Sequence, residues 1–226
     1  MPMNTSAIIV AAGTSQRMGF DKLATPLAGM PVLRRTLDAF LAVPCVAEII
    51  VVCSQERWKL LENTDSGSFP KPVRRVDGGA SRQASVANGL AAVATGATWV
   101  AVHDGARPLV SPEDIACCVA AAGKFGAASL ARRVTDTIKR SDAEDFSAEA
   151  LPRDQLWFME TPQVFELGLL TEAYAAVSAR QLEVTDEVSA VQAIGRRVKF
   201  IEAKHPNPKI TRPADLALAT AILTIQ

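Results

Sequence analysis

The chain has 226 residues, of which 49% are apolar and 21% charged, enough to bury the core of one domain. Its 24 basic side chains balance 24 acidic ones, so no net field would hold a polynucleotide or an anionic membrane surface, and we expect no nucleic acid and no membrane as partner. The start has no signal-peptide pattern and no apolar run approaches the ~18 residues of a membrane span, so we expect a cytoplasmic chain.

Short apolar runs alternate with helical patterns along the first part of the chain. Apolar runs predict strands at residues 7–12, 48–53, 73–76, 99–103 and 127–131. Apolar residues at helical spacing predict helices at residues 31–42, 81–94 and 112–122. The runs 8–10 and 49–52 are apolar on both faces, as expected of central parallel strands covered by helices on each side. The predicted fold is therefore α/β, with a doubly wound, mostly parallel sheet.

The alternation stops at about residues 135–157. A charged stretch at 139–145 separates two β-like pieces, 137–140 and 155–159. Such a hairpin has too little core to stand alone, so we expect a protruding β-arm that packs on a partner subunit, although a surface loop would also fit. The remaining pattern predicts helices near 166–177, 186–194 and 213–222 and a strand near 198–203. We expect one domain over residues 1–226 that includes this dimerisation arm.

The loop after the first predicted strand is the richest candidate for an anion site. Ligands of open α/β sheets bind beyond the carboxyl ends of the strands. Small residues at Ala11, Ala12 and Gly13 let backbone N–H groups approach an anion, while Arg17 and Lys22 supply cations for a polyphosphate. The loop matches neither the Walker A motif nor GxGxxG, which argues against a P-loop ATPase and a Rossmann dehydrogenase. An ordinary strand-to-helix turn with solvated charges remains an alternative.

A second candidate closes the strand at 99–103. The carboxylate of Asp104 could hold Mg²⁺ between nucleotide phosphates, with other divalent cations possible. An aspartate at a strand end is also a common turn cap. We expect the neighbouring His103 to be a hydrogen-bonded core histidine. The four cysteines lack the spacing of a zinc site, which favours a reduced chain.

Two further features are individually weak. Gly78 and Gly79 precede a predicted helix and could hydrogen-bond the edge of a base, with Ser85 behind them, but a helix-opening turn explains these glycines equally well. Lys209 lies just ahead of the final predicted helix, where an isolated lysine is usually only exposed.

Together these features resemble one family, the 2-C-methyl-D-erythritol 4-phosphate cytidylyltransferases, from residue 7 to residue 222. The matching stretches are 11–13 through 17–18 to Lys22, Gly78-Gly79 with Arg82 and 85–86, 103–104 with 106–108, 136–140, 161–163, 185–187 and 209–213. The chain departs from the family pattern at Asp21, Ala80, Gly105 and Pro208, and none of these departures removes a cation or the candidate metal ligand.

The resemblance implies roles for some of the matching residues. Arg17 and Lys22 would grip the triphosphate of CTP, Lys209 would assist at the phosphates, and Asp104 would lie beside Mg²⁺. The family forms homodimers, so Thr137 and Arg153 of the arm would meet the acceptor phosphate in the neighbour's site together with Arg107. The other substrate contacts that the resemblance implies are Ala11, Ala12, Gly13, Gly78, Gly79, Ser85, Thr161 and Thr185.

The implied reaction transfers CMP from CTP to 2-C-methyl-D-erythritol 4-phosphate, giving 4-diphosphocytidyl-2-C-methyl-D-erythritol and pyrophosphate, in non-mevalonate isoprenoid precursor synthesis. A phosphate monoester is already an anion near neutral pH, so this reaction needs no general base. It needs cations around the transferred group and the leaving pyrophosphate. Ribitol 5-phosphate is an alternative acceptor, and a non-catalytic nucleotide-sensing module is the alternative from another class.

Overall fold

A computed structural model of the chain describes residues 4–13, 18–62 and 69–225. Its main sheet has seven strands within these residues, and the spatial order is β11-β7-β10-β6-β1-β4-β5. β1 pairs in parallel with both β4 and β6, whereas β10 pairs antiparallel with β6 and β7. The strands are β1 (Thr5–Val10), β4 (Val46–Val52), β5 (Val73–Val76), β6 (Trp99–Asp104), β7 (Ala127–Arg133), β10 (Trp157–Glu166) and β11 (Lys199–Glu202).

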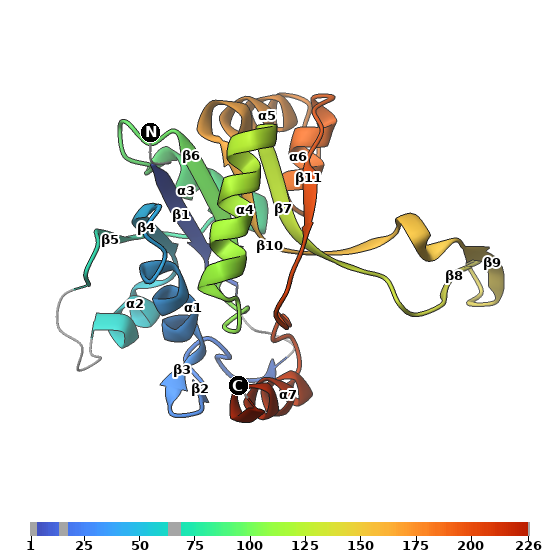
Figure 1. Ribbon diagram of the computed structural model, residues 1–226, viewed down its shortest axis with the longest axis horizontal. Helices are drawn as coiled ribbons and strands as arrows, with labels where there is room; N and C mark the ends of the chain where they lie inside the picture. The colour runs from blue at the N-terminus through green and yellow to red at the C-terminus, as the bar shows by residue number, and fades with distance from the viewer. Residues whose placement is uncertain (1–3, 14–17, 63–68, 226) are drawn as a thin grey trace.

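Helices cover both faces of this sheet (Figure 1). Alternate residues of one strand enter opposite cores: Ala7 and Ile9 pack in one buried cluster and Ile8 packs in the other. The first core includes residues of α1 (Val32–Leu41), α2 (Gln55–Glu62), α4 (Pro112–Phe125) and α7 (Pro213–Ile225), and the second includes residues of α3 (Arg82–Ala91), α5 (Leu167–Ala179) and α6 (Glu187–Ala193). The predicted doubly wound, mostly parallel sheet is therefore confirmed.

Local sequence signals explain where α4 begins and ends. Ser111 precedes the helix, and its hydroxyl accepts a hydrogen bond from the Asp114 N–H at 3.0 Å. Gly126 ends the helix with a φ of 83°, a conformation that side chains disfavour. The strand β7 then starts at once, so the helix returns directly to the sheet.

Some elements differ from the sequence prediction. The helix α2 was not predicted because charged residues occupy half of its eight positions, while Leu61 is its buried apolar residue. The piece predicted at 155–159 as an arm strand is instead the start of β10, which continues to Glu166 in the main sheet. Pro162 argues against a central strand, and the structure accommodates it where the register with β7 shifts between Met159 and Gln163.

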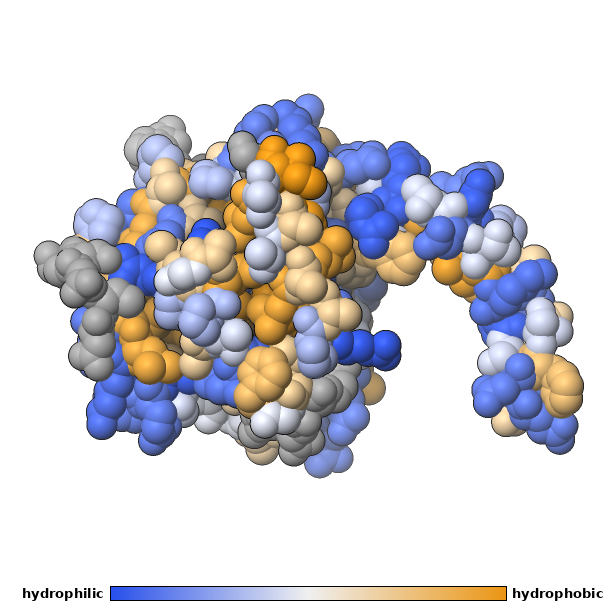
Figure 2. All heavy atoms as spheres, turned by 90° about the horizontal axis from the view of Figure 1, so that it is seen from below, coloured by the Kyte–Doolittle hydropathy of each residue, from blue (hydrophilic) through white to orange (hydrophobic). Residues whose placement is uncertain are grey.

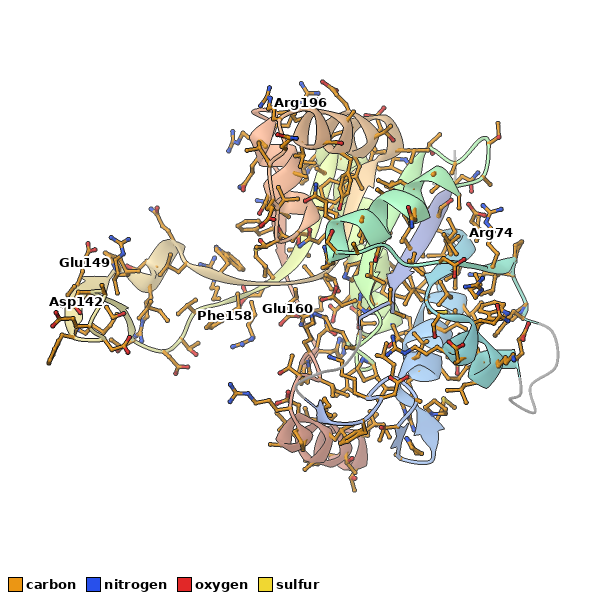
Figure 3. The ribbon with its side chains drawn as sticks, turned by 180° about the vertical axis from the view of Figure 1, so that it is seen from behind. Arg74, Asp142, Glu149, Phe158, Glu160 and Arg196 are labelled. Carbon is orange, nitrogen blue, oxygen red and sulfur yellow. The ribbon has the colours of Figure 1, made fainter. Side chains whose placement is uncertain are left out.

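The arm is a hairpin of β8 (Ile138–Ser141) and β9 (Ser147–Leu151), followed by a short 3-10 helix, η2 (Arg153–Gln155). It projects from one side of the body (Figure 1) and is arched along its length in the view from below (Figure 2). Residues 139–150 are all exposed. Figure 3 shows Asp142 and Glu149 near its far end, and Phe158 and Glu160 where the chain returns to the body. A smaller hairpin pairs β2 (Pro26–Leu27) with β3 (Met30–Pro31).

Candidate active site

A cavity of about 590 Å³ opens at the carboxyl ends of β1 and β6. Its walls come from the residues after β1, the turn before α3, the end of β6 and the segment before α7. Eight residues predicted from the sequence line it: Ala11, Ala12, Gly13, Lys22, Gly79, Ser85, Asp104 and Lys209. The lining also includes Val10, Met18, Leu23, Ala80, Ser81, Arg82, Ala106 and Thr211. Arg17 lies outside the described residues.

Asp104 is held by cations on both of its carboxylate oxygens. Lys209 Nζ lies 2.7 Å from Oδ2, and Arg82 Nε lies 3.2 Å from Oδ1. The guanidinium of Arg107 lies 3.9 Å from Oδ2. Burial alone would raise the pKa of Asp104, but Arg82, Lys209 and Arg107 together hold that pKa well below its usual range. The carboxylate is therefore ionised at neutral pH.

Lys22 and Lys209, from opposite ends of the chain, meet in this cavity. Lys22 Nζ donates to the carbonyl oxygen of Ile210 at 2.7 Å, and the Ile210 N–H donates to the Ala106 carbonyl at 2.8 Å. Asn207 anchors the same segment, since its amide nitrogen donates to the Thr161 carbonyl oxygen at 2.9 Å. These contacts fix the backbone that carries Lys209.

The two glycines before α3 are required by close packing. A Cβ on Gly78 would lie 2.3 Å from Ala12 Cβ, and a Cβ on Gly79 would lie 2.4 Å from Ala84 Cβ. The Ser85 hydroxyl accepts from the Gly79 N–H at 3.0 Å, so it holds this turn in place. Gly79 and Ser85 line the cavity, whereas Gly78 is packed against the start of the β1 loop.

Sequence reasoning assigned no role to Arg82, which connects the cavity to a buried network. Its guanidinium makes a bidentate pair with Glu187, with contacts of 2.7 and 3.0 Å. Glu187 is fully buried, and Tyr174 donates its hydroxyl proton to it at 2.9 Å. Arg82 lies in the first turn of α3, directly after the glycine turn, and that position was the available signal for a site residue.

His103 is a core residue, as predicted. It is fully buried, and burial lowers its pKa to about 3, so the ring is neutral. Its Nε2 lies 3.2 Å from the Arg107 carbonyl oxygen, which can only accept, so Nε2 carries the proton. The Thr161 hydroxyl then donates to Nδ1 at 3.0 Å and accepts from the Asp104 N–H at 3.1 Å. Thr161 therefore lies behind Asp104 and is not among the described cavity-lining residues.

The remaining predicted site residues lie elsewhere in the single chain. Thr137 and Arg153 are exposed on the arm, and Arg153 donates a hydrogen bond to the Thr135 carbonyl oxygen. Thr185 is exposed just before α6. Arg107 uses its guanidinium to donate to the carbonyl oxygens of Asn207, at 2.7 Å, and Met159, at 3.2 Å. None of these four lines the cavity formed by the described part of one chain.

Within the described ranges no group of three or more His, Cys, Asp or Glu side chains could hold a metal by itself. Asp104 is the ionised carboxylate that lines the cavity. Among the same described residues, no helix has the length and apolar character needed to cross a membrane.

Comparisons with known proteins agree with this geometry. The family model for 2-C-methyl-D-erythritol 4-phosphate cytidylyltransferase matches residues 5–225. The enzyme of that name from Pelotomaculum thermopropionicum is 38% identical, over 96% of this chain and 93% of the relative. The one from Ralstonia nicotianae is 44% identical, over 96% of this chain and 90% of the relative.

Solved structures give the same result. The crystal structure of 4-diphosphocytidyl-2C-methyl-D-erythritol synthase from Anaerococcus prevotii is 30% identical, with a TM-score of 0.86 over 99% of this chain and 97% of that one. The 2-C-methyl-D-erythritol 4-phosphate cytidylyltransferase from Thermus thermophilus is 34% identical, with a TM-score of 0.80 over 98% and 100%. Sequence and fold thus agree along almost the entire length, and this chain belongs to the 2-C-methyl-D-erythritol 4-phosphate cytidylyltransferase family.

Proposed function

We propose that the chain transfers CMP from CTP to 2-C-methyl-D-erythritol 4-phosphate and releases pyrophosphate. The observation that carries this proposal is the convergence of Lys22, Lys209 and Asp104 on one cavity with the glycine turn before α3. A cavity of about 590 Å³ lies in the size range of small-molecule sites. Family membership supplies the two substrates, and it favours this acceptor over ribitol 5-phosphate.

The residues suit a reaction that requires stabilisation of negative charge on the phosphates and no transfer of a proton. An oxygen of the acceptor phosphate bonds to the α-phosphorus of CTP, and the bond from that phosphorus to the β-phosphate oxygen breaks, so the electron pair leaves with pyrophosphate. The acceptor is already ionised, and the buried neutral ring of His103 takes no part. In this proposal Lys22 and Lys209 stabilise the developing charge and orient the triphosphate, and Arg17 assists them.

In the same proposal Asp104 is the ligand of a magnesium ion, which would share the carboxylate with Arg82 and Lys209. Mg²⁺ in nucleotide sites is bound through one or two carboxylates plus phosphate oxygens and water, and Asp104 offers one ionised carboxylate at the cavity wall. Bound there, Mg²⁺ would neutralise part of the charge of the polyphosphate. Another divalent cation of similar oxygen preference could replace it.

The arm supports a shared site in a homodimer. Thr137 and Arg153 are exposed on a segment that projects from the body, where a second copy of the chain can reach them (Figure 2). Phe146, at the turn of the arm, has 67% of its surface exposed, which is costly for an aromatic side chain left in water. We propose that Thr137 and Arg153 meet the acceptor phosphate in the partner's site beside Arg107, and that Thr161 and Thr185 contribute to that substrate region.

We further propose that the enzyme works in the cytoplasm. All four cysteines, Cys45, Cys53, Cys117 and Cys118, are free thiols. A chain without disulfides suits a reducing compartment.

One assay tests the proposed reaction. The purified chain is incubated with CTP, Mg²⁺ and one acceptor at a time, and pyrophosphate release is followed. We expect turnover with 2-C-methyl-D-erythritol 4-phosphate. Turnover with ribitol 5-phosphate alone would overturn the assignment of the acceptor, and tight binding of CTP without pyrophosphate release with either acceptor would indicate a nucleotide-sensing module.

A further inference from the structure

A buried arginine on α2 contacts both ends of the segment 11–21, which follows β1 and is called the β1 loop. Arg57 is 8% exposed and lies outside the cavity lining. Its Nε lies 2.7 Å from Asp21 Oδ2, and its Nη1 donates to the carbonyl oxygen of Ala11. Ala11 follows β1 directly, whereas Asp21 precedes Lys22. One guanidinium therefore joins the two ends of the segment that delivers Lys22 to the cavity.

Asp21 is fixed on its other side as well. Its Oδ1 accepts a hydrogen bond from the Leu23 N–H at 3.0 Å, and its backbone carbonyl accepts from the Thr25 hydroxyl at 3.0 Å. The Leu23 side chain is 4% exposed and belongs to the first of the two buried cores. Lys22 thus sits between two anchored residues, and little backbone freedom remains at the position that directs its side chain.

The geometry requires arginine at position 57. A guanidinium presents several N–H groups in a rigid plane, so it can donate to a carboxylate and to a carbonyl in different directions. A lysine ammonium on a flexible stem could satisfy one of these acceptors but is poorly suited to hold both. Because the Asp21 side chain is 36% exposed, the ion pair adds little stability, and its main effect is to fix position.

We propose that Arg57 is a positioning residue for nucleotide binding, acting through Asp21 and Ala11 to present Lys22 to the triphosphate. We call this arrangement the Arg57 clip. The inference rests on the proposed function, because it assumes that the cavity receives CTP. The inference assigns a role in nucleotide binding to α2, although this helix contributes no side chain to the cavity lining in the described part of the chain.

The chain offers a matched control for a purely structural role. Arg34 and Asp38 on α1 form an ion pair of 2.8 Å with the same exposed side-chain fractions, 10% and 36%, as Arg57 and Asp21. Neither Arg34 nor Asp38 lines the cavity. Loss of a buried arginine that only stabilises the fold should therefore have the same effect at either site.

The test compares Arg57→Met, Asp21→Asn, the double variant and Arg34→Met by steady-state kinetics and by calorimetric titration with CTP. We expect Arg57→Met to raise the KM and Kd for CTP about tenfold, the size of one lost charged hydrogen bond, with the acceptor KM within about twofold of the original. The double variant should be no worse than the poorer single variant, because both changes remove the same contact. Arg34→Met should leave both KM values unchanged.

Two results would overturn the Arg57 clip: single-variant effects that multiply in the double variant, or a change in CTP affinity for Arg57→Met no larger than that for Arg34→Met. If Arg57→Met does not fold, Asp21→Asn decides alone, since its amide keeps an acceptor for Leu23, and an unchanged KM for CTP would refute the proposal. Turnover by the unaltered chain separates the two ideas. Its absence refutes the proposed function, whereas normal turnover with unaffected variants refutes only the Arg57 clip.

Discussion

Lys209 Nζ lies 2.7 Å from Asp104 Oδ2, across a sequence separation of 105 residues. This contact joins the last segment before α7 to the end of β6, the strand beside β1 at the centre of the sheet. It also places a cation within reach of the one carboxylate that the described cavity lining contains. The pair therefore places two groups of opposite charge side by side in the cavity proposed to receive CTP and a metal ion.

Replacing Lys209 with methionine should lower the rate of pyrophosphate release roughly 10²-fold, because one preorganised cation at a transition state contributes on the order of 3 kcal/mol. Stopped-flow measurement at saturating CTP gives this rate, and Lys209→Arg should retain more activity. A circular dichroism melt serves as the control. A rate for Lys209→Met within about twofold of the original would exclude a role for this lysine in the reaction.

Removing divalent cations with EDTA should abolish turnover, and added Mg²⁺ should restore it. Asp104→Asn should raise the Mg²⁺ concentration needed for half-maximal rate, because an amide is a weaker metal ligand than a carboxylate. A Mg²⁺ titration of the rate measures this shift. Asp142→Asn at the far end of the arm is the control and should leave the titration unchanged; an equal shift in both variants would contradict the assignment of Asp104.

Gly78→Ala should weaken CTP binding, because the new Cβ would lie 2.3 Å from Ala12 Cβ and push the β1 loop aside. Ala12→Gly removes the atom responsible, so the double variant should recover most of the affinity. Calorimetric titration with CTP measures all three variants. Failure of Ala12→Gly to rescue Gly78→Ala would show that the clash is not the cause.

Arg153→Ala and Thr137→Ala should each raise the KM for the acceptor while leaving the Kd for CTP nearly unchanged, since the arm is proposed to touch only the acceptor phosphate. Mixing Arg153→Ala subunits with Lys22→Met subunits should restore some turnover, because a mixed dimer would contain one site with both residues intact. Equal losses of CTP affinity, or mixed samples as inactive as their parents, would argue against a shared site.

Native-state thiol labelling should distinguish neighbouring cysteines. Cys117 is partly exposed, whereas Cys118 is fully buried and its pKa is raised by burial. Burial also raises the pKa of Cys53 to about 11, so its reactive thiolate stays scarce at pH 7 to 9. Mass spectrometry after maleimide treatment should show modified Cys117 and protected Cys53 and Cys118. Labelling in guanidinium chloride, where all thiols are accessible, provides the reference; rapid native labelling of Cys118 would contradict its buried position.

Most strands of the main sheet and most helices could be predicted because local burial of an element appears in the sequence as an apolar pattern. The runs at 8–10 and 49–52 are apolar on both faces because helices cover both sides of the sheet. Asp104 could be found for a related reason, since it follows such a run at the edge where ligands bind. Pro162 concealed the second half of β10, because a proline signals an interruption that the structure absorbs in a register shift.

Long-range contacts between charged side chains produce no pattern in the local sequence. Arg57 lies on a helix whose charged residues predict a solvated surface. No local sequence feature distinguishes Arg57 from Lys59, two positions further on. The pair of Arg82 and Glu187 is separated by 105 positions, so neither residue indicates its partner. These contacts can be identified only from the three-dimensional structure, which brings the distant segments together.

The contact between Lys22 and the carbonyl of Ile210 spans 188 positions. During synthesis on a ribosome, which proceeds from the first residue to the last, the amino-terminal half of the site emerges long before Ile210 is made. The nascent chain therefore has no complete cavity until the segment that carries Lys209 and Ile210 has left the exit tunnel and docked. A chain that ends before Lys209 would lack this contact and one of the two lysines that line the cavity, so we expect it to bind CTP poorly.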